Sequence, residues 1–161
     1  MKKIRINNLF LSYISIMIIL ISISYAIVEY YTNEDYLQVD IIKIVNGNQI
    51  LFGNKCTAII ATTSPERAYS IQLALEKRYD QRPTTHDSFS DVLNSFNITL
   101  ERVNIERFDG QFYYSNMILK QNKNVLELDT KPSDAIAIAI RLHAPIYVNK
   151  TLLEEQGQNI C

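Results

Sequence analysis

The sequence predicts an α+β fold, with helices packed on a mixed or antiparallel sheet, and three observations support this prediction. The 161-residue chain is 47% hydrophobic and 20% charged, a composition typical of a folded domain with its own core. Runs of β-branched residues are joined by short turns that contain Asn and Gly, which is the pattern of hairpins. Two segments with apolar residues at helical spacing each follow a strand and a turn, so we expect two related strand-turn-helix halves.

The beginning of the chain has a different composition, and we divide the sequence into an N-terminal segment, 1–30, and a domain, 31–161. An uncharged and mostly apolar run extends from 9 to 28, and about 20 such residues cross roughly 30 Å of hydrocarbon as a helix. Three basic residues precede this run: Lys2, Lys3 and Arg5. Because basic flanks stay in the cytoplasm, the sequence predicts a single transmembrane helix, a cytoplasmic N-terminus and an extracytoplasmic domain.

A cleaved signal peptide is the alternative interpretation of the N-terminal segment. Ser24-Tyr25-Ala26 loosely resembles a small-x-small cleavage site. The apolar run is longer than the usual core of a signal peptide, and we therefore expect a retained, single-pass membrane anchor. Both interpretations place the domain outside the cytoplasm.

The domain begins with a predicted hairpin and a strand that leads into a helix. β-branched residues flank Asn46-Gly47-Asn48 within the segment 36–53, and Asn-Gly is a strong turn signal. The apolar run from Cys56 to Thr62 predicts a buried strand. Ser64-Pro65-Glu66 then starts a helix, with a serine N-cap, a proline in the first turn and an acid near the positive end of the dipole.

Pro83 prevents this helix from continuing, and a second helix is expected to begin near Thr85, as its N-cap, and to stop at Asn97. The sequence that follows favours strands, joined by turns at two places: Asp109-Gly110 and Asn122-Lys123-Asn124. A helix from about Ser133 to Leu142, a short strand "PIYV" and a terminal helical turn complete the predicted domain.

Two stretches of the domain, 62–75 and 129–142, align without gaps at an offset of 67 residues. The alignment matches five pairs: Thr63 with Thr130, Pro65 with Pro132, Ala68 with Ala135, Ile71 with Ile138, and Leu75 with Leu142. Each copy is a strand end, a Thr-x-Pro turn and a helix. We interpret the copies as two related halves around one core, with chance similarity between amphipathic helix starts as the alternative.

Charge and cysteine content restrict the classes of function. Without the three N-terminal cations, 13 Lys and Arg remain against 17 Asp and Glu, and this net charge of −4 gives little general attraction to nucleic acid. Cys56 and Cys161 match no zinc-binding spacing. In an oxidising compartment the two cysteines suit a disulfide, and two free buried thiols are the alternative.

One group of candidate site residues lies at the expected start of the second helix. Unpaired N–H groups and the helix dipole stabilise an acid there, so Asp87 needs no catalytic role to be useful. The same position disfavours the cationic form of His86 and favours a neutral imidazole that can accept a proton or bind a metal. Arg82 is a candidate phosphate clamp, or else a surface ion-pair partner of Asp80 or Asp87.

A second group lies around the start of the last long helix. Asp129 ends a strand, Asp134 lies in the first helical turn, and Ser133 supplies a hydroxyl. Together with His86, the two carboxylates predict a site for a divalent cation, Mg²⁺ or Mn²⁺, which would polarise a phosphodiester and activate water. The same residues would serve equally as capping groups and surface acids. Without a metal, a phosphodiesterase built here would need nearby cations to offset the acids: Arg82, Lys131 and Arg141.

The strings "RPTTHD" and "PSDAIA" resemble the two hallmark strings of the bifunctional nuclease domain family, and the resemblance extends from about Ala61 to Gly157. It implies an α+β domain and, from some plant members, degradation of both DNA and RNA. It implies no settled set of catalytic residues. The matching motif positions are Arg82, Pro83, Thr85, His86 and Asp87 in the first string, and Pro132, Ser133, Asp134 and Ala135 in the second.

One departure from the family pattern bears on the metal. Where the family often has Glu-Ala at the start of the first helix, this chain has Arg67-Ala68, with Glu66 displaced by one residue, or about 100° around a helix. In the internal alignment, Arg67 takes the position that Asp134 has in the second copy. If the family's acid binds a metal, this chain has lost a ligand, and if the acid only caps a helix, Glu66 can replace it.

The resulting hypothesis is a membrane-anchored, extracytoplasmic nuclease that hydrolyses phosphodiester bonds of DNA or RNA with a divalent cation. We predict four catalytic residues: Arg82, His86, Asp87 and Asp134. We predict three metal ligands: His86, Asp129 and Asp134. The alternative is a non-catalytic envelope domain of the same fold, in which the hallmark strings are turns and caps and which binds a protein or forms homo-oligomers.

Overall fold

The computed structural model describes residues 12–22 and 35–161, and the chain divides at Asp35 into two units that are described separately. In the N-terminal unit, residues 12–22 form a helix. Within 12–22 and 35–161, no helix combines the length and the apolar character needed to cross a bilayer. The predicted membrane segment, 9–28, extends outside the described residues at both ends, so the anchor stays a prediction.

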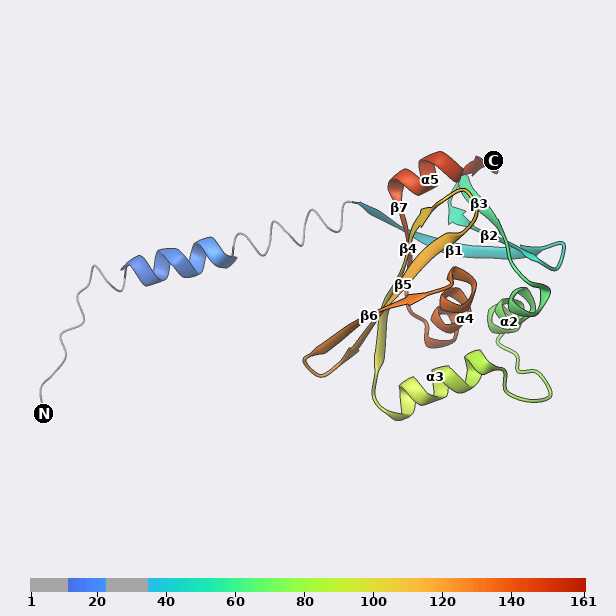
Figure 1. Cartoon of the computed structure of the whole chain (residues 1–161), viewed down its shortest axis with the longest axis horizontal. Coiled ribbons are helices and arrows are strands. Elements are labelled where there is room, and N and C mark those ends of the chain that lie inside the picture. Colours follow the sequence, from blue (N-terminus) through green and yellow to red (C-terminus); the bar gives the residue numbers. More distant parts are fainter. Residues whose placement is uncertain (1–11, 23–34) are drawn as a thin grey trace, which may run out of the picture. The chain divides into compact units, whose positions relative to one another are not determined.

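The unit from Tyr36 to Cys161 has the predicted α+β fold (Figure 1). Its strands are β1 (Tyr36–Val45), β2 (Gln49–Asn54), β3 (Thr57–Thr62), β4 (Thr99–Phe108), β5 (Tyr113–Gln121), β6 (Asn124–Thr130), β7 (Ile146–Asn149) and β8 (Gln158–Asn159). Its helices are α2 (Pro65–Leu75), α3 (Thr85–Ser95), α4 (Pro132–Leu142) and α5 (Lys150–Gln156).

The strands form one mixed sheet in the order β6-β5-β4-β7-β1-β2-β3-β8. The pair β4 and β7 is parallel and every other neighbouring pair is antiparallel. The three predicted turns are confirmed as the connections β1–β2, β4–β5 and β5–β6. Asn46 and Gly47 have φ values of 52° and 73°, as a tight hairpin turn with two left-handed residues requires.

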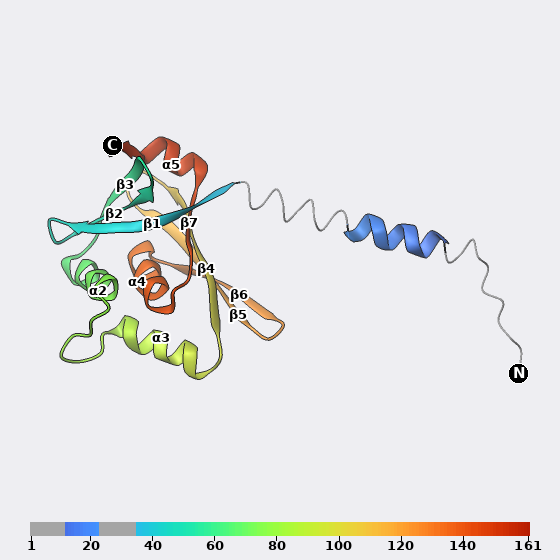
Figure 2. The same ribbon diagram turned by 180° about the vertical axis from the view of Figure 1, so that it is seen from behind.

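Helix α4 occupies the centre of the helical layer. Figure 1 and Figure 2 show α2, α3 and α4 grouped together, with α5 apart from them near the C-terminus. The alternating "AIAIAI" sequence of α4 is buried almost all round, because the helix contacts α2, α3, β4 and β5. A helix that is apolar on every face needs such surroundings, and its alanines allow the neighbouring helices to approach closely.

The start of α3 differs from the expectation by one residue. Thr84, and not Thr85, is the N-cap, which makes Asp87 the third helical residue. The Thr84 hydroxyl accepts a hydrogen bond from the Asp87 N–H, and the Asp87 carboxylate accepts one from the Thr84 N–H, so the two residues form a capping box. Both threonines are good N-caps, but only Thr84 has this reciprocal partner three positions later.

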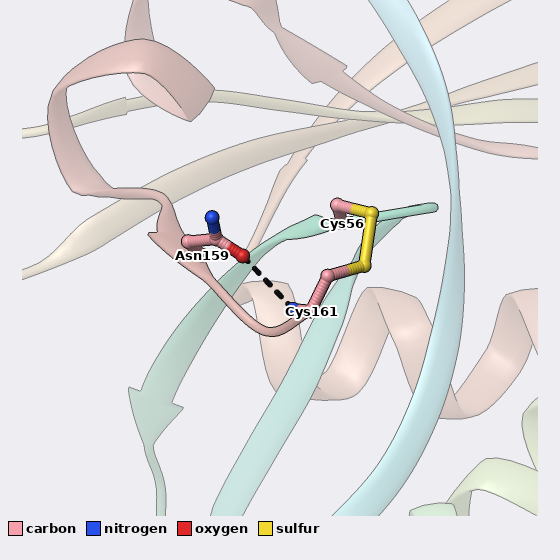
Figure 3. The surroundings of a disulfide bond; sticks show 3 residues. All are labelled: Cys56, Asn159 and Cys161. Carbon is pink, nitrogen blue, oxygen red and sulfur yellow. Dashed lines mark hydrogen bonds between the residues drawn. A yellow bond between two sulfur atoms is a disulfide. The ribbon is translucent and has the colours of Figure 1, made fainter.

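A disulfide between Cys56 and Cys161 joins the start of β3 to the end of the chain (Figure 3). The Asn159 side chain accepts a hydrogen bond of 2.9 Å from the Cys161 N–H, and β8 pairs with β3 beside the bond. The bond that the sequence suggested is therefore formed. It closes a loop over a sequence separation of 105 residues and ties the last strand to the sheet.

Candidate functional site

The first turns of α2, α3 and α4 bring three charged or ionisable side chains together. His86 Nε2 lies 3.3 Å from Asp134 Oδ1, although the two residues are 48 positions apart in the sequence. Arg67 Nε lies 3.0 Å from the same Asp134 oxygen. His86 and Asp134 were each predicted both as a catalytic residue and as a metal ligand. The structure places these two side chains in contact.

This cluster is open to solvent. The side chains of His86, Asp134 and Arg67 are 15%, 29% and 36% exposed, so all three can be reached by a ligand. Both contacts of Asp134 go to Oδ1, which leaves Oδ2 without a hydrogen bond to another described residue. That oxygen is a free acceptor beside a guanidinium and an imidazole.

The hydrogen bonds around His86 favour one arrangement of protons. Its Nδ1 lies 2.9 Å from Ser70 Oγ, and that hydroxyl also accepts a 3.1 Å hydrogen bond from Arg141 Nη2. If Ser70 donates its proton to Nδ1, then Nε2 carries a hydrogen that it donates to Asp134. The opposite tautomer would bring the Nε2 lone pair against a carboxylate oxygen, which is repulsive.

The order Ser70, His86, Asp134 matches the serine–histidine–carboxylate sequence of a nucleophilic triad. A nucleophile must reach its substrate, however, and Ser70 is only 4% exposed. Its hydroxyl also already accepts a hydrogen bond from Arg141. We therefore assign Ser70 an orienting role: it fixes the imidazole ring from the interior while Asp134 holds it from the solvent side.

Asp87, the acid of the first candidate group, supports the structure and forms no hydrogen bond or ion pair with Arg67, His86 or Asp134. Its Oδ1 accepts a 2.5 Å hydrogen bond from Arg141 Nε, and its Oδ2 accepts bonds from the N–H and hydroxyl of Thr84. Burial raises the pKa of Asp87, but the bonds from Arg141 and Thr84 outweigh it, and the net pKa lies below the ordinary value. Asp87 is thus a buried carboxylate with its acceptor positions taken.

Arg141 connects this ion pair to the cluster. Its Nη1 donates to the Ala137 carbonyl and its Nη2 donates to the carbonyl and hydroxyl of Ser70. Ser70 and Ala137 are equivalent positions in the internal alignment, so one guanidinium joins the matching turns of α2 and α4. Arg141 thus pairs with the acid Asp87 and supports His86 through Ser70.

The remaining candidates are not joined to the cluster by any contact. Arg82 is exposed in the connection between α2 and α3, where it forms no ion pair with another described residue. Asp129 lines a cavity of about 730 Å³ that Arg67, Lys131 and Ser133 also line, but that has neither His86 nor Asp134 in its wall. Neither the predicted phosphate clamp, Arg82, nor the predicted third metal ligand, Asp129, forms a hydrogen bond or ion pair with His86 or Asp134.

A divalent cation does not fit the cluster as it is built. Among the residues that the structure describes, no three His, Cys, Asp or Glu side chains are grouped as a metal site would require. At Asp134, the Arg67 guanidinium already supplies positive charge to Oδ1, and the Nε2–H of His86 points to the same oxygen. The donor set is one carboxylate and one imidazole, short of the three protein ligands of a typical catalytic metal.

Sequence reasoning missed the roles of Arg67 and Ser70. Arg67 drew attention only as a departure from a family pattern, and Ser70 is one of many serines in the chain. The internal alignment carried a usable signal, because it pairs Arg67 with Asp134, residues of opposite charge. Helices α2 and α4 pack against each other, and the equivalent residues Arg67 and Asp134 meet in that contact.

Comparison with known proteins decides the family. The family model described as "Bifunctional nuclease domain" matches residues 54–160, which include α2, α3, α4 and the whole cluster. The chain belongs to the bifunctional nuclease domain family. The expectation drawn from the two hallmark strings is thereby confirmed.

The chain is similar in sequence to other proteins, among them one from Mycobacterium tuberculosis and two from plants. The chain is 33% identical over 76 residues to an uncharacterized protein of Mycobacterium tuberculosis, covering 47% of this chain and 44% of that protein. It is 28% identical over 123 residues to bifunctional nuclease 1 of Oryza sativa subsp. japonica, covering 74% and 35%. It is 29% identical over 82 residues to bifunctional nuclease 1 of Arabidopsis thaliana, covering 49% and 25%. The chain spans less than half the length of these relatives.

Proposed function

We propose that this bifunctional nuclease domain hydrolyses phosphodiester bonds of DNA, RNA or both at the cluster of Arg67, His86 and Asp134. The observation that supports the proposal most strongly is the 3.3 Å contact between His86 and Asp134, from separate helices, at a solvent-accessible site with a guanidinium beside it. The plant relatives, at 28% to 29% identity, are named as nucleases. A residue that only caps its own helix does not need contacts with charged or ionisable side chains of two other helices.

In the proposed reaction, Arg67 binds a non-bridging phosphate oxygen and stabilises the negative charge that grows there as water attacks. Asp134 accepts the proton of the attacking water through Oδ2, while His86 and Ser70 hold the carboxylate in position. The new bond joins the water oxygen to phosphorus, the ester P–O bond breaks, and the leaving oxygen takes a proton from solvent. Arg67 must leave Asp134 in part when it binds phosphate, which frees the carboxylate to act as a base.

The predicted Mg²⁺ or Mn²⁺ enters none of these steps, because Arg67 supplies the positive charge at Asp134. Metal dependence is tested in the same assay as cleavage. If a chelator leaves the cleavage rate unchanged, the reaction proceeds without a metal ion, as proposed. If cleavage requires Mg²⁺ or Mn²⁺, a cation must enter with a rearrangement of Arg67, and its ligands would be sought among His86, Asp129 and Asp134.

The test is cleavage of labelled single-stranded DNA and RNA by the full chain, with and without divalent ions. We expect His86→Gln to lower the cleavage rate about 100-fold, because His86 positions the base Asp134 and misplacement of a catalytic group can cost about 10²-fold. The chain has one other histidine, and His143→Asn is the matched control, since His143 ends α4 in a left-handed conformation that Asn tolerates. No cleavage by the wild type, or equal cleavage by His86→Gln, would refute the proposal.

We also propose that residues 9–28 anchor the chain in a membrane, with the N-terminus in the cytoplasm and the nuclease domain outside it. The basic residues before the run support this orientation. The disulfide between Cys56 and Cys161 supports an oxidising compartment. In intact cells, external protease should degrade the domain, and protection of the domain from protease would overturn this orientation.

The alternative is a non-catalytic domain that binds a protein or forms homo-oligomers. The buried pair of Asp87 and Arg141 favours it, because Asp87, a residue of the first hallmark string, serves stability there. It predicts that His86→Gln and Asp134→Asn lower the melting temperature without any activity to lose. The cleavage assay therefore separates the two functions.

A further inference from the structure

A cavity lies next to the proposed catalytic cluster. The cavity of about 730 Å³ is bounded by the starts of α2 and α4, by β2 and β3, and by the connection between β4 and β5. Its volume is within the range of pockets that bind small molecules or single building blocks of polymers. Arg67 lines this cavity and also contacts Asp134, so one side chain joins the cavity to the proposed catalytic cluster.

One wall of the cavity is aromatic and held in place. Phe112 is 57% exposed, an unusual position for a large apolar ring. Asp109 fixes the turn that carries it, because its carboxylate accepts hydrogen bonds from the N–H groups of Gln111 and Phe112 at 2.8 and 2.7 Å. The next ring, Tyr113, stacks on Phe108 with 4.5 Å between the ring centroids. The wall therefore presents an exposed aromatic face at little cost in conformational entropy.

Another part of the lining is suited to an anion. Lys131 lines the cavity and forms no ion pair with another described residue. Ser133 also lines it, is 8% exposed, and its hydroxyl has no hydrogen-bond partner among the described residues. Helix α4 starts here without a side-chain cap, and its N-cap is Lys131 itself. A cation at the positive end of a helix is unfavourable unless negative charge lies nearby, and the acid in the first turn of α4, Asp134, is already held by Arg67 and His86.

The charges of the lining agree with this assignment. Arg67 and Lys131 are positive and Asp129 is the single acid among the lining residues. The lining is thus net positive, whereas the chain as a whole carries a net charge of −1. An aromatic face and a cationic corner in one cavity match a ligand with a flat ring and a phosphate.

We propose that this cavity binds one nucleotide of a single-stranded nucleic acid, with its base stacked on Phe112 and its phosphate at Lys131 and Ser133. The inference rests on the proposed function, since it makes the cavity a subsite that places the neighbouring phosphodiester at Arg67 and Asp134. A base inside a duplex is stacked on both faces and cannot use an aromatic wall, so the subsite selects single strands.

Binding is measured separately from cleavage, by fluorescence anisotropy of a short labelled single-stranded oligonucleotide with the full chain. All proteins carry His86→Gln, so that the probe stays intact, and each variant is compared by melting temperature. We expect Phe112→Ala to weaken binding about tenfold, since one base–aromatic stack contributes about 1–3 kcal/mol. The matched control is Phe96→Ala, which removes a phenylalanine that is 64% exposed at the end of α3 and outside the cavity.

A second pair of variants tests the phosphate contact. Lys131→Gln should weaken binding and reduce the salt dependence of the affinity by about one phosphate contact. Lys123→Gln, in the turn between β5 and β6, is its control and should change neither quantity. Duplex DNA of the same length should bind more weakly than the single strand.

The outcomes separate the subsite from the proposed function. Absent binding, equal affinity for single strand and duplex, or an affinity that Phe112→Ala leaves unchanged would each overturn the subsite, even if the wild type cleaves. Binding that depends on Phe112 and Lys131 in a protein that does not cleave would retain the subsite and refute only the nuclease reaction.

Discussion

Asp87, paired with Arg141, shows how a single residue of a hallmark motif can serve stability next to a reactive group. Both side chains are buried, at 5% and 9% exposure, so neither charge can be left without its partner at low cost. Arg141 also donates to Ser70, which orients His86. The motif therefore combines a structural ion pair with a candidate catalytic imidazole one residue away.

Replacing Arg141 by methionine should destabilise the fold strongly. The change leaves the Asp87 carboxylate buried and unpaired, and loss of one partner of such a pair costs about 3–5 kcal/mol. Urea unfolding measures this difference. Arg78→Met, which removes the exposed partner of Glu76, should cost about 1 kcal/mol or less. Recovery of part of the loss in Asp87→Asn/Arg141→Met would support the pairing, and equal losses for Arg141→Met and Arg78→Met would contradict it.

The same pair makes stability depend on acid pH. The folded-state pKa of Asp87 lies below its ordinary value of 3.8, so its contribution is fully present above that value and is lost as pH falls through the folded-state pKa. Unfolding free energies between about pH 6 and about pH 2 should therefore fall more steeply for the wild type than for Asp87→Asn. Asp91→Asn, on an exposed position of the same helix, should keep the wild-type slope. A wild-type slope in Asp87→Asn would contradict the assignment.

At the scale of elements, the starts of the four helices in the domain differ in how they are capped. Helix α3 is capped by Thr84 and Asp87, and α5 by the Asn149 side chain, whereas α2 and α4 have no side-chain cap. The two uncapped helices are the ones whose first turns line the large cavity. A side-chain cap thus stabilises the start of α3, which carries His86. The first backbone N–H groups of α2 and α4 have no side-chain cap and are available to a ligand.

A threonine pair provides a test of the observed cap. Thr84→Ala removes the hydroxyl that bonds to both the N–H and the carboxylate of Asp87, and it should cost about 1 kcal/mol of unfolding free energy. Thr85→Ala changes the residue that the sequence indicated as the cap, and it should have little effect because that hydroxyl makes no hydrogen bond to a described residue. Thermal or urea unfolding distinguishes them, and a larger loss in Thr85→Ala would restore the original expectation.

Most elements of the domain were predictable because their signals are local. Asn46-Gly47 and Asp109-Gly110 specify turns whatever lies around them, and Pro65 and Pro132 mark helix starts. The insertion of β7 between β4 and β1, parallel to one and antiparallel to the other, was not predictable. That order depends on contacts between distant segments, which no short pattern records.

The candidate site was predictable only in part for the same reason. Helix-start chemistry identified His86 and Asp134 as candidates, and both lie in the cluster. Asp129 and Arg82 had the right residue types, but neither forms a hydrogen bond or ion pair with His86 or Asp134, and no short sequence pattern records which candidates will meet. The role of Arg67 needed the packing of α2 against α4.

At the scale of the whole molecule, the disulfide holds the end of the chain on the sheet. It closes a loop across a separation of 105 residues, which the chain-entropy model relates to about 4–5 kcal/mol. The double variant Cys56→Ser/Cys161→Ser should therefore melt well below the wild type, and a reductant should lower the wild-type melting temperature without affecting the double variant. A wild type that melts at the same temperature with reductant would show that the bond contributes nothing.

The most direct measurement of the proposed active site is a double-mutant cycle on the cleavage rate, with melting temperatures measured alongside. If His86 and Asp134 act as a unit, His86→Gln should reduce the rate about 100-fold and Asp134→Asn at least 100-fold, and the double variant should be no slower than the worse single variant. Rate losses that multiply in the double variant, or single variants that cleave at the wild-type rate, would contradict a shared function of the two residues.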